Sequence, residues 1–436
     1  MGIALSTARF QQCVCEVELR VLRALYHGAP VTVILGGARL MSLQGWAKHD
    51  EAETPVITPQ QGEASDQPPL GFPSSIEGPM VWPGGNTTWL DSQILELSPT
   101  DVAEVEQAVD HFLSLGLDGS EVTRENFPLP SLGPRLQDRA ADIHQGSGLC
   151  IVRGLGSYSA EDDTIIFLGI ASYIGSQRGV QTSKGAMLTH IYESDSWTVP
   201  REKRHGIHTN GSLPFHNDMG CEILAIHIRD CAARGGGTYV ASVAAVYNVM
   251  MKTNPWVVHI LAKHNWPVQV SRGTSPFVLA PLLGYQSGNL VMSADPSRIG
   301  PHPAVANNRI PDLEPSQKEA LALLQQTATA QQMRLPACQG DIVFINNWGV
   351  LHARDSYQDD STATRHLVRL WLRNEEYSWE VPKSMKTPWE ASFGTRAQKI
   401  VNRQYPVAPM PEYMEPKFTN GSAAFIMEES DEDGER

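Results

Sequence analysis

Apolar residues recur every three or four positions in four stretches of the chain, and this spacing predicts helices. The first stretch starts at Ser98, whose hydroxyl is suited to cap a helix, and Pro99 follows in a position that proline favours. The third stretch contains Pro255, which is expected to break it. The predicted helices cover residues 98–116, 160–175, 240–264 and 315–333.

Short apolar runs between turn residues predict strands in four further stretches, 148–155, 221–232, 340–355 and 362–376. No internal repeat is present. Helices combined with many short, separated strands indicate a β-barrel or a double sheet flanked by helices.

Composition divides the chain into three parts. Residues 51–80 contain six prolines together with several Gly, Ser and Gln, which is the composition of a linker. The last ten residues form an acidic run of the kind that stays solvated. We therefore expect an N-terminal extension and disordered linker over 1–80, one catalytic domain over 81–410, and a disordered acidic tail over 411–436.

The net charge, the apolar runs and the cysteines indicate which classes of protein the chain does not resemble. The formal net charge of −14 argues against a nucleic-acid surface, since phosphate binding needs clustered Lys and Arg. No run of about 18 apolar residues predicts a membrane span. Six scattered cysteines without a C-x-x-C pair are typical of reduced thiols inside a cell. The expected location is the cytoplasm, with the mitochondrion as the alternative suggested by arginines near the N-terminus.

Three polar residues at strand positions have the chemistry of a metal site. His216 and Asp218 are two residues apart, so in an extended segment they point the same way. His352 ends the apolar strand that follows Gly340-Asp341. Two histidines and one carboxylate form the facial triad of non-haem Fe(II) oxygenases, which leaves coordination positions open. Each piece alone is equally consistent with an ordinary polar residue at a strand end.

Arginines on one strand suggest an anion site. Alternation in 362–376 places Arg365, Arg369, Trp371 and Arg373 on one face. Buried guanidinium groups are costly unless paired, and a dicarboxylate would pair with them. The alternative is an edge strand with arginines in water or paired with the two glutamates that follow. Upstream, Gly235–Gly237 form a turn before Thr238, whose hydroxyl is suited to donate to a carboxylate.

Together these pieces resemble a known family. H-x-D at 216–218, G-G-x-T at 235–238, "LHAR" around His352, and R-x-x-x-R at 365–369 resemble the TauD/TfdA, or taurine dioxygenase-like, Fe(II)/2-oxoglutarate oxygenases. The resemblance implies an α+β fold whose double-stranded β-helix (jelly-roll) core, as in clavaminate synthase, is flanked by helices. It also implies Fe(II) ligands at His216, Asp218 and His352, a 2-oxoglutarate site at Arg365 and Thr238, and a substrate contact at Arg369.

The predicted function is an Fe(II)- and 2-oxoglutarate-dependent dioxygenase that uses O2 to hydroxylate or desaturate a small anionic organic substrate, releasing succinate and CO2. Three alternatives remain open from the sequence: a catalytically degenerate binding protein of the same fold, a cupin- or Jumonji-type oxygenase acting on a larger substrate, and a zinc hydrolase. The substrate, the reaction outcome and the oligomeric state are not predicted.

Overall fold

The computed structural model describes residues 67–85, 87–181, 185–269, 276–301, 310–399 and 405–413. The predictions for residues 1–66 and 414–436 lie outside this part of the chain. Within it, the helices are α2 (Thr87–Asp91), α3 (Pro99–Ser114), α4 (Leu132–Gln145), α5 (Ala160–Ile174), α6 (Val243–Thr253), α7 (Pro255–Leu261), α8 (Pro315–Ala330), α9 (Lys386–Phe393) and α10 (Thr395–Lys399).

Two sheets form the centre of the fold. The larger runs in the order β1 (Ile94–Glu96), β2 (Leu149–Arg153), β14 (Ile342–Asn346), β6 (Ile223–Asp230), β17 (His366–Arg373) and β3 (Gln177–Arg178), with β4 (Leu188–Tyr192) also paired to β17. The smaller runs β13 (Met333–Arg334), β8 (Thr238–Ser242), β15 (Val350–Arg354), β5 (Leu213–His216). Only the β1–β2 pairing in these two sheets is parallel among the described strands.

Shorter hairpins complete the strands. β9 (Trp266–Gln269) pairs with β10 (Phe277–Ala280), and β11 (Leu283–Gln286) pairs with β12 (Asn289–Met292). β7 (Arg234–Gly235) pairs with β16 (Tyr357–Gln358), and Gly236 and Gly237 connect β7 to β8 in a different sheet. The triple glycine therefore links two strands that are not paired with each other, and it is not a hairpin turn.

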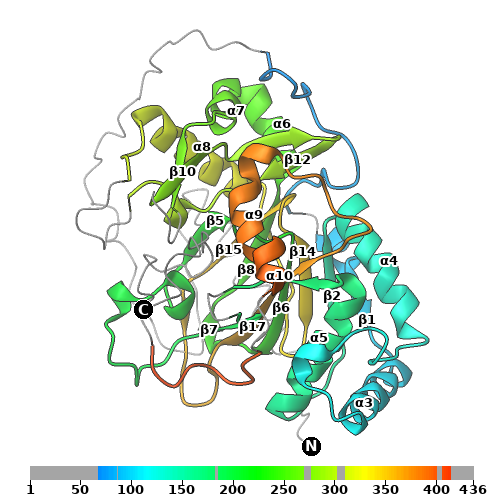
Figure 1. The fold of residues 1–436 in the computed structure, drawn as a ribbon. Helices are drawn as coiled ribbons and strands as arrows, with labels where there is room; N and C mark the ends of the chain where they lie inside the picture. Colours follow the sequence, from blue (N-terminus) through cyan, green and yellow to red (C-terminus); the bar gives the residue numbers. More distant parts are fainter. Residues whose placement is uncertain are drawn as a thin grey trace, which may run out of the picture. The chain divides into compact units, whose positions relative to one another are not determined.

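Alternation along the strands explains how the two sheets are layered. On β2, Cys150 and Val152 pack with α3, α4 and α5, whereas Leu149 and Ile151 lie in the core shared with the smaller sheet. On β15, Leu351 packs with α6, α7 and α8, whereas Val350 lies in the core between the sheets. Helices therefore cover the outer faces of both sheets (Figure 1). This is the double-stranded β-helix flanked by helices that the sequence predicted.

The helix signals read from the sequence are mostly confirmed. The Ser98 hydroxyl caps α3 by accepting from the Asp101 backbone N–H at 3.2 Å, and the Asp101 carboxylate accepts from the Ser98 N–H at 2.8 Å. The break at Pro255 separates α6 from α7. α4 was not predicted, although Leu132, Leu136, Ala140 and Ile143 are buried at helical spacing along it.

Packing in the described chain starts upstream of residue 81. The Ile76 N–H donates to the Asn248 Oδ1 at 2.7 Å, and the Asn248 Nδ2 donates back to the Ile76 carbonyl at 2.8 Å. The Tyr247 hydroxyl donates to the Pro73 carbonyl at 2.5 Å. These contacts attach the proline-rich segment to α6, so its described residues are part of the packed structure.

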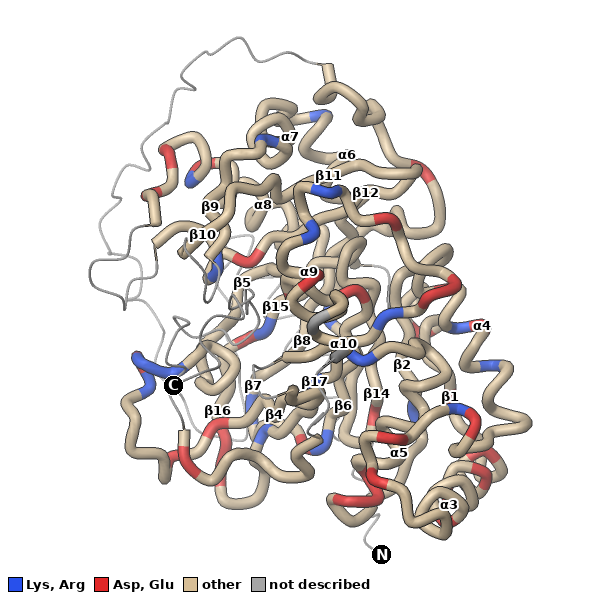
Figure 2. Tube along the Cα trace, in the orientation of Figure 1, with Lys and Arg blue, Asp and Glu red and all other residues tan. Residues whose placement is uncertain are grey.

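None of the described helices is long and apolar enough to cross a membrane. Acidic positions gather on α3 and beside it, whereas Lys and Arg are spread over many elements (Figure 2).

Candidate metal centre

Strand pairing brings two histidines together from distant parts of the chain. His216 ends β5 and lies directly opposite His352 on β15 in the antiparallel register. The centroids of their imidazole rings are 4.1 Å apart. The two histidines are 136 positions apart in the sequence (352 − 216), and the pairing of β5 with β15 brings their side chains into contact.

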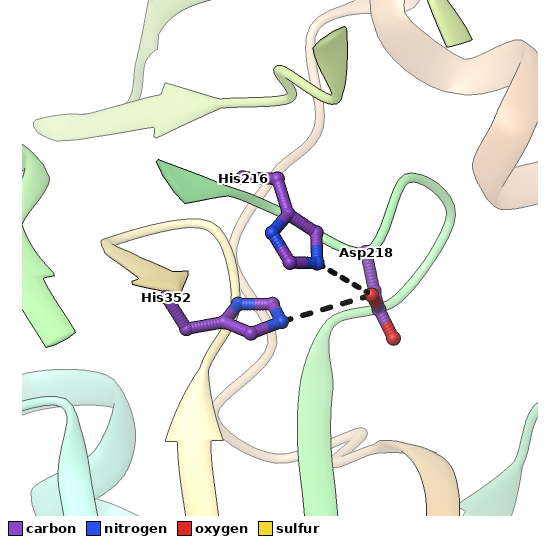
Figure 3. Close-up of side chains that lie close together, drawn as sticks. All are labelled: His216, Asp218 and His352. Carbon is purple, nitrogen blue, oxygen red and sulfur yellow. Dashed lines mark ion pairs between the residues drawn. The ribbon is translucent and has the colours of Figure 1, made fainter. Parts of the chain in front are cut away.

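Asp218 completes the group from the turn after β5. Its Oδ1 is 3.8 Å from the Nε2 atoms of both His216 and His352. One donor atom from each residue lies within 4.8 Å of the other two, and the three side chains point toward one another (Figure 3). Separations of 3.8 Å are too long for hydrogen bonds and leave room for a metal ion between the three donor atoms.

The protonation states suit metal binding. The His216 Nδ1 lies 2.8 Å from the Pro214 carbonyl, so Nδ1–H donates there and the Nε2 lone pair faces Asp218. Burial lowers the pKa of His352 to about 3, and the neighbouring His216 contributes to the same shift. Burial acts to raise the pKa of Asp218, but Arg369, His352 and His216 together hold it well below its usual range. The group therefore presents a neutral imidazole at His352, the Nε2 atom of His216 and a carboxylate.

A second layer of contacts orients the Asp218 carboxylate. Its Oδ2 accepts from the Arg369 Nη1 and from the Trp371 Nε1, both at 2.9 Å. The Arg369 Nε donates to the Gln181 Oε1 at 2.9 Å. Because Oδ2 is occupied in this way, Oδ1 is the oxygen left to face the two histidines. The sequence predicts that Arg369 contacts the substrate. The structure shows its contact with Asp218, and the contact with the substrate remains a prediction.

Replacing Trp371 with phenylalanine is expected to weaken metal binding about 10-fold, within the range seen when outer contacts of a ligand are removed. The ring remains in the core and only the Nε1–H donor to Asp218 is lost. Fe(II) affinity measured by anaerobic titration checks this, and Trp266→Phe is the matched control because its buried Nε1 donates to the Ile260 carbonyl instead. An unchanged affinity in the Trp371 variant would show that the donor does not matter.

Buried asparagines hold the backbone around Asp218. The Asn347 Oδ1 accepts from the Asp218 N–H at 2.9 Å, and its Nδ2 donates to the Asp218 and Cys221 carbonyls at 2.8 Å each. The Asn217 Nδ2 donates to the Asn347 carbonyl at 2.6 Å. Sequence reasoning missed this scaffold, and the only available signal was the polar pair Asn346-Asn347 directly after an apolar strand.

Replacing Asn347 with alanine is expected to lower the free energy of unfolding by about 3 kcal/mol, because it removes three buried hydrogen bonds to the backbone of Asp218 and Cys221. The Asp218 carbonyl keeps its bond from the Cys221 N–H at 3.1 Å. Denaturant unfolding measures this, and Asn126→Ala, which removes only exposed hydrogen bonds, should change stability by less than about 1 kcal/mol. Equal effects in the two variants would contradict the proposed scaffold.

The structure also places the predicted cosubstrate residues. Arg365 immediately precedes β17 and is buried, with its Nη1 lacking a hydrogen-bond partner among the described residues. A Cβ on Gly236, whose φ is +69°, would lie 3.0 Å from the Arg365 Cδ, so glycine is required for this close approach. Thr238 lies on β8 opposite Arg354 of β15. Burial lowers the pKa of Arg365 to about 10, and Arg354 adds to the shift.

Comparisons with known proteins agree with this arrangement. Residues 113–371 match the model of the "Taurine catabolism dioxygenase TauD, TfdA family". The chain is 34% identical over 327 residues to the taurine hydroxylase-like protein SAT17 of Stachybotrys chartarum, covering 72% of this chain and 84% of that protein. It is 24% identical over 332 residues to the FR-33289 synthase of Streptomyces rubellomurinus, covering 70% and 93%.

Among solved structures, an asparagine oxygenase in complex with Fe(II), 2S,3S-3-hydroxyasparagine and succinate has a TM-score of 0.51. The match covers 65% of this chain and 94% of that one at 16% identity, so it supports the fold. The family match spans the interval that contains His216, Asp218, His352 and Arg365. The chain therefore belongs to the TauD/TfdA family of dioxygenases.

Proposed function

We propose that His216, Asp218 and His352 bind Fe(II), and that Arg365 and Thr238 bind 2-oxoglutarate, for the oxidation of a small anionic organic substrate. The observation that carries this proposal is the convergence of three donor atoms, one each from His216, Asp218 and His352, within 4.8 Å of one another. Two imidazoles and one carboxylate on one side of the site form the donor set that Fe(II) oxygenases use. Thiolate ligands, which favour structural zinc, are absent from this group.

Fe(II), 2-oxoglutarate and O2 together supply the oxidising chemistry: decarboxylation of 2-oxoglutarate to succinate is coupled to oxidation of a substrate C–H bond. The chain contributes binding and orientation. Arg369 and Trp371 hold Asp218, the Pro214 carbonyl holds His216, and the buried Arg365 offers its guanidinium to the distal carboxylate of 2-oxoglutarate.

The charge around Asp218 supports an anionic substrate. Arg298, in the short 3-10 helix Pro296–Arg298, is partly buried and interacts electrostatically with Asp218 and Arg369. Burial lowers the pKa of His205 well below its usual value, and Arg298, His208 and Arg369 add to the shift. Asp295 also pairs with Arg298, at 3.5 Å, so two guanidinium groups face two carboxylates here. A bound Fe(II) would make the net charge of this group positive, which favours a carboxylate, sulfonate or phosphonate on the substrate. The names of the relatives, a taurine hydroxylase-like protein and an asparagine oxygenase, likewise refer to small molecules.

The proposal is tested by incubating the protein with Fe(II), 2-oxoglutarate, O2 and a panel of small amino acids, sulfonates and phosphonates. The expected result is succinate formation and O2 consumption in equal amounts, raised by at least one anionic compound. Hydrolysis of a panel compound with Zn(II) in the absence of O2 would instead support a zinc hydrolase. Binding of 2-oxoglutarate without any succinate would support a degenerate binding protein. Turnover of added peptides but of none of the small compounds would contradict the small anionic substrate.

A further inference from the structure

Arg354 is a buried arginine of the site that the family motifs leave without a role. It lies on β15 two residues beyond His352, so both side chains project from the same face of the strand. Its Nη2 donates to the carbonyl of Thr209 at 2.9 Å, to that of Gly206 at 3.3 Å, and to that of Gly211. Its Nε and Nη1 are buried and have no hydrogen-bond partner among the described residues.

Tyr357 links Arg354 to Arg365. The guanidinium carbons of both arginines lie 5.2 Å from the centroid of the Tyr357 ring. The Tyr357 hydroxyl and the Arg365 Nη1 are also buried without a partner in the described part of the chain. Three side chains, each at most 6% exposed, therefore hold four buried donor groups together without a visible acceptor. Buried donors of this kind are costly unless an acceptor satisfies them.

The charge of this cluster is positive. Glu193 and Asp359 are the acidic residues that act on Arg354, Arg365 or Tyr357 from nearby. Glu193 forms ion pairs with Arg201 at 2.5 Å and with Arg204 at 3.6 Å. Asp359 accepts from the backbone N–H of Arg365 at 3.0 Å. Burial lowers the pKa of both cluster arginines, as expected when guanidinium charge is incompletely compensated.

We propose that Arg354 is a second cation of the 2-oxoglutarate site, which binds the distal carboxylate together with Arg365 and the Tyr357 hydroxyl. This inference rests on the proposed function. Because the Arg354 Nη2 also holds residues 206–211, binding of the cosubstrate is coupled to the order of the segment that leads into His216. Tyr357 joins the same segment through its N–H, which donates to the Asn210 carbonyl at 3.0 Å.

The test compares two 2-oxo acids on metal-loaded protein under anaerobic conditions, with dissociation constants measured by calorimetry. 2-Oxoglutarate carries the distal carboxylate and 2-oxobutanoate does not. Arg354→Gln is expected to weaken 2-oxoglutarate binding about 10-fold or more, because a charge-assisted bond is lost, and to change 2-oxobutanoate binding less than about twofold. Arg234→Gln, on the exposed strand β7, is the control and should change neither constant.

Hydrogen exchange in residues 204–213 distinguishes a loss of 2-oxoglutarate binding from a general loss of stability in the variant. In the wild-type chain, 2-oxoglutarate should slow backbone hydrogen exchange in residues 204–213, and in Arg354→Gln this protection should be lost. If Arg354→Gln does not fold, Tyr357→Phe replaces it and should weaken 2-oxoglutarate selectively by about fivefold. Equal losses for both 2-oxo acids, or no loss for either, would overturn the proposal. If the wild-type chain binds no 2-oxoglutarate, the result contradicts the proposed function itself and not only the role of Arg354.

Discussion

Alanine at position 352 is expected to abolish 2-oxoglutarate-dependent turnover. His352 supplies one of three donor atoms, and its imidazole is kept neutral by burial at the centre of the site. Loss of an outer contact to a ligand typically weakens metal binding about 10- to 100-fold, so loss of the ligand itself should exceed about 100-fold. Succinate formation and bound Fe(II) should therefore fall together.

His259→Ala is the matched control for this variant. His259 lies on α7 and its Nε2 contacts the Gln67 carbonyl in an exposed position, away from the metal centre. Succinate formation at the wild-type rate by the His352 variant would show that His352 is not a ligand. Equal loss in both variants would point to misfolding, which circular dichroism and thermal unfolding of each protein would reveal.

Glutamine at position 365 is expected to raise the dissociation constant for 2-oxoglutarate by about 100-fold while leaving Fe(II) affinity nearly unchanged. Arg365 is buried against Gly236 and Tyr357 and has an unpartnered Nη1 within the described structure, so its charge is available to a carboxylate. Loss of a hydrogen-bonded buried charge pair costs about 3 kcal/mol, which corresponds to this change in binding.

The two constants are measured by separate anaerobic titrations. Arg124→Gln, whose ion pair with Glu125 is exposed, should alter neither of them. A loss of Fe(II) affinity as large as the loss of 2-oxoglutarate affinity would mean that Arg365 supports the fold of the centre and does not bind the cosubstrate.

The convergence of His216, Asp218 and His352 was predictable because each of these residues follows a local rule. His216 and Asp218 needed only the two-residue repeat of an extended chain, and His352 needed only its place at the end of an apolar strand. The expectation that these three residues form one site came from the order of motifs along the chain, which is typical of the TauD/TfdA family. The layered core was equally predictable, since alternating apolar residues on the strands separate into the two cores that flank each sheet.

The residues that support the centre could not be predicted in this way. Asn347 acts through hydrogen bonds to a backbone 129 positions away, and Arg354 acts through carbonyls 143 to 148 positions away. Trp371 lay on the predicted face with Arg369, but its contact with Asp218 depends on the packing of β17 against the turn after β5. Such contacts are fixed by tertiary structure, and no spacing along the chain encodes them.

The central claim is that His216, Asp218 and His352 hold one ferrous ion that also binds 2-oxoglutarate. Anaerobic titration of the protein with Fe(II) and 2-oxoglutarate, followed by visible absorption, tests it most directly. A charge-transfer band that needs both additions, saturates at one equivalent of Fe(II) and is missing in His352→Ala is the predicted result. A wild-type protein that shows no such band, or a His352→Ala variant that shows the same band, would contradict the assignment.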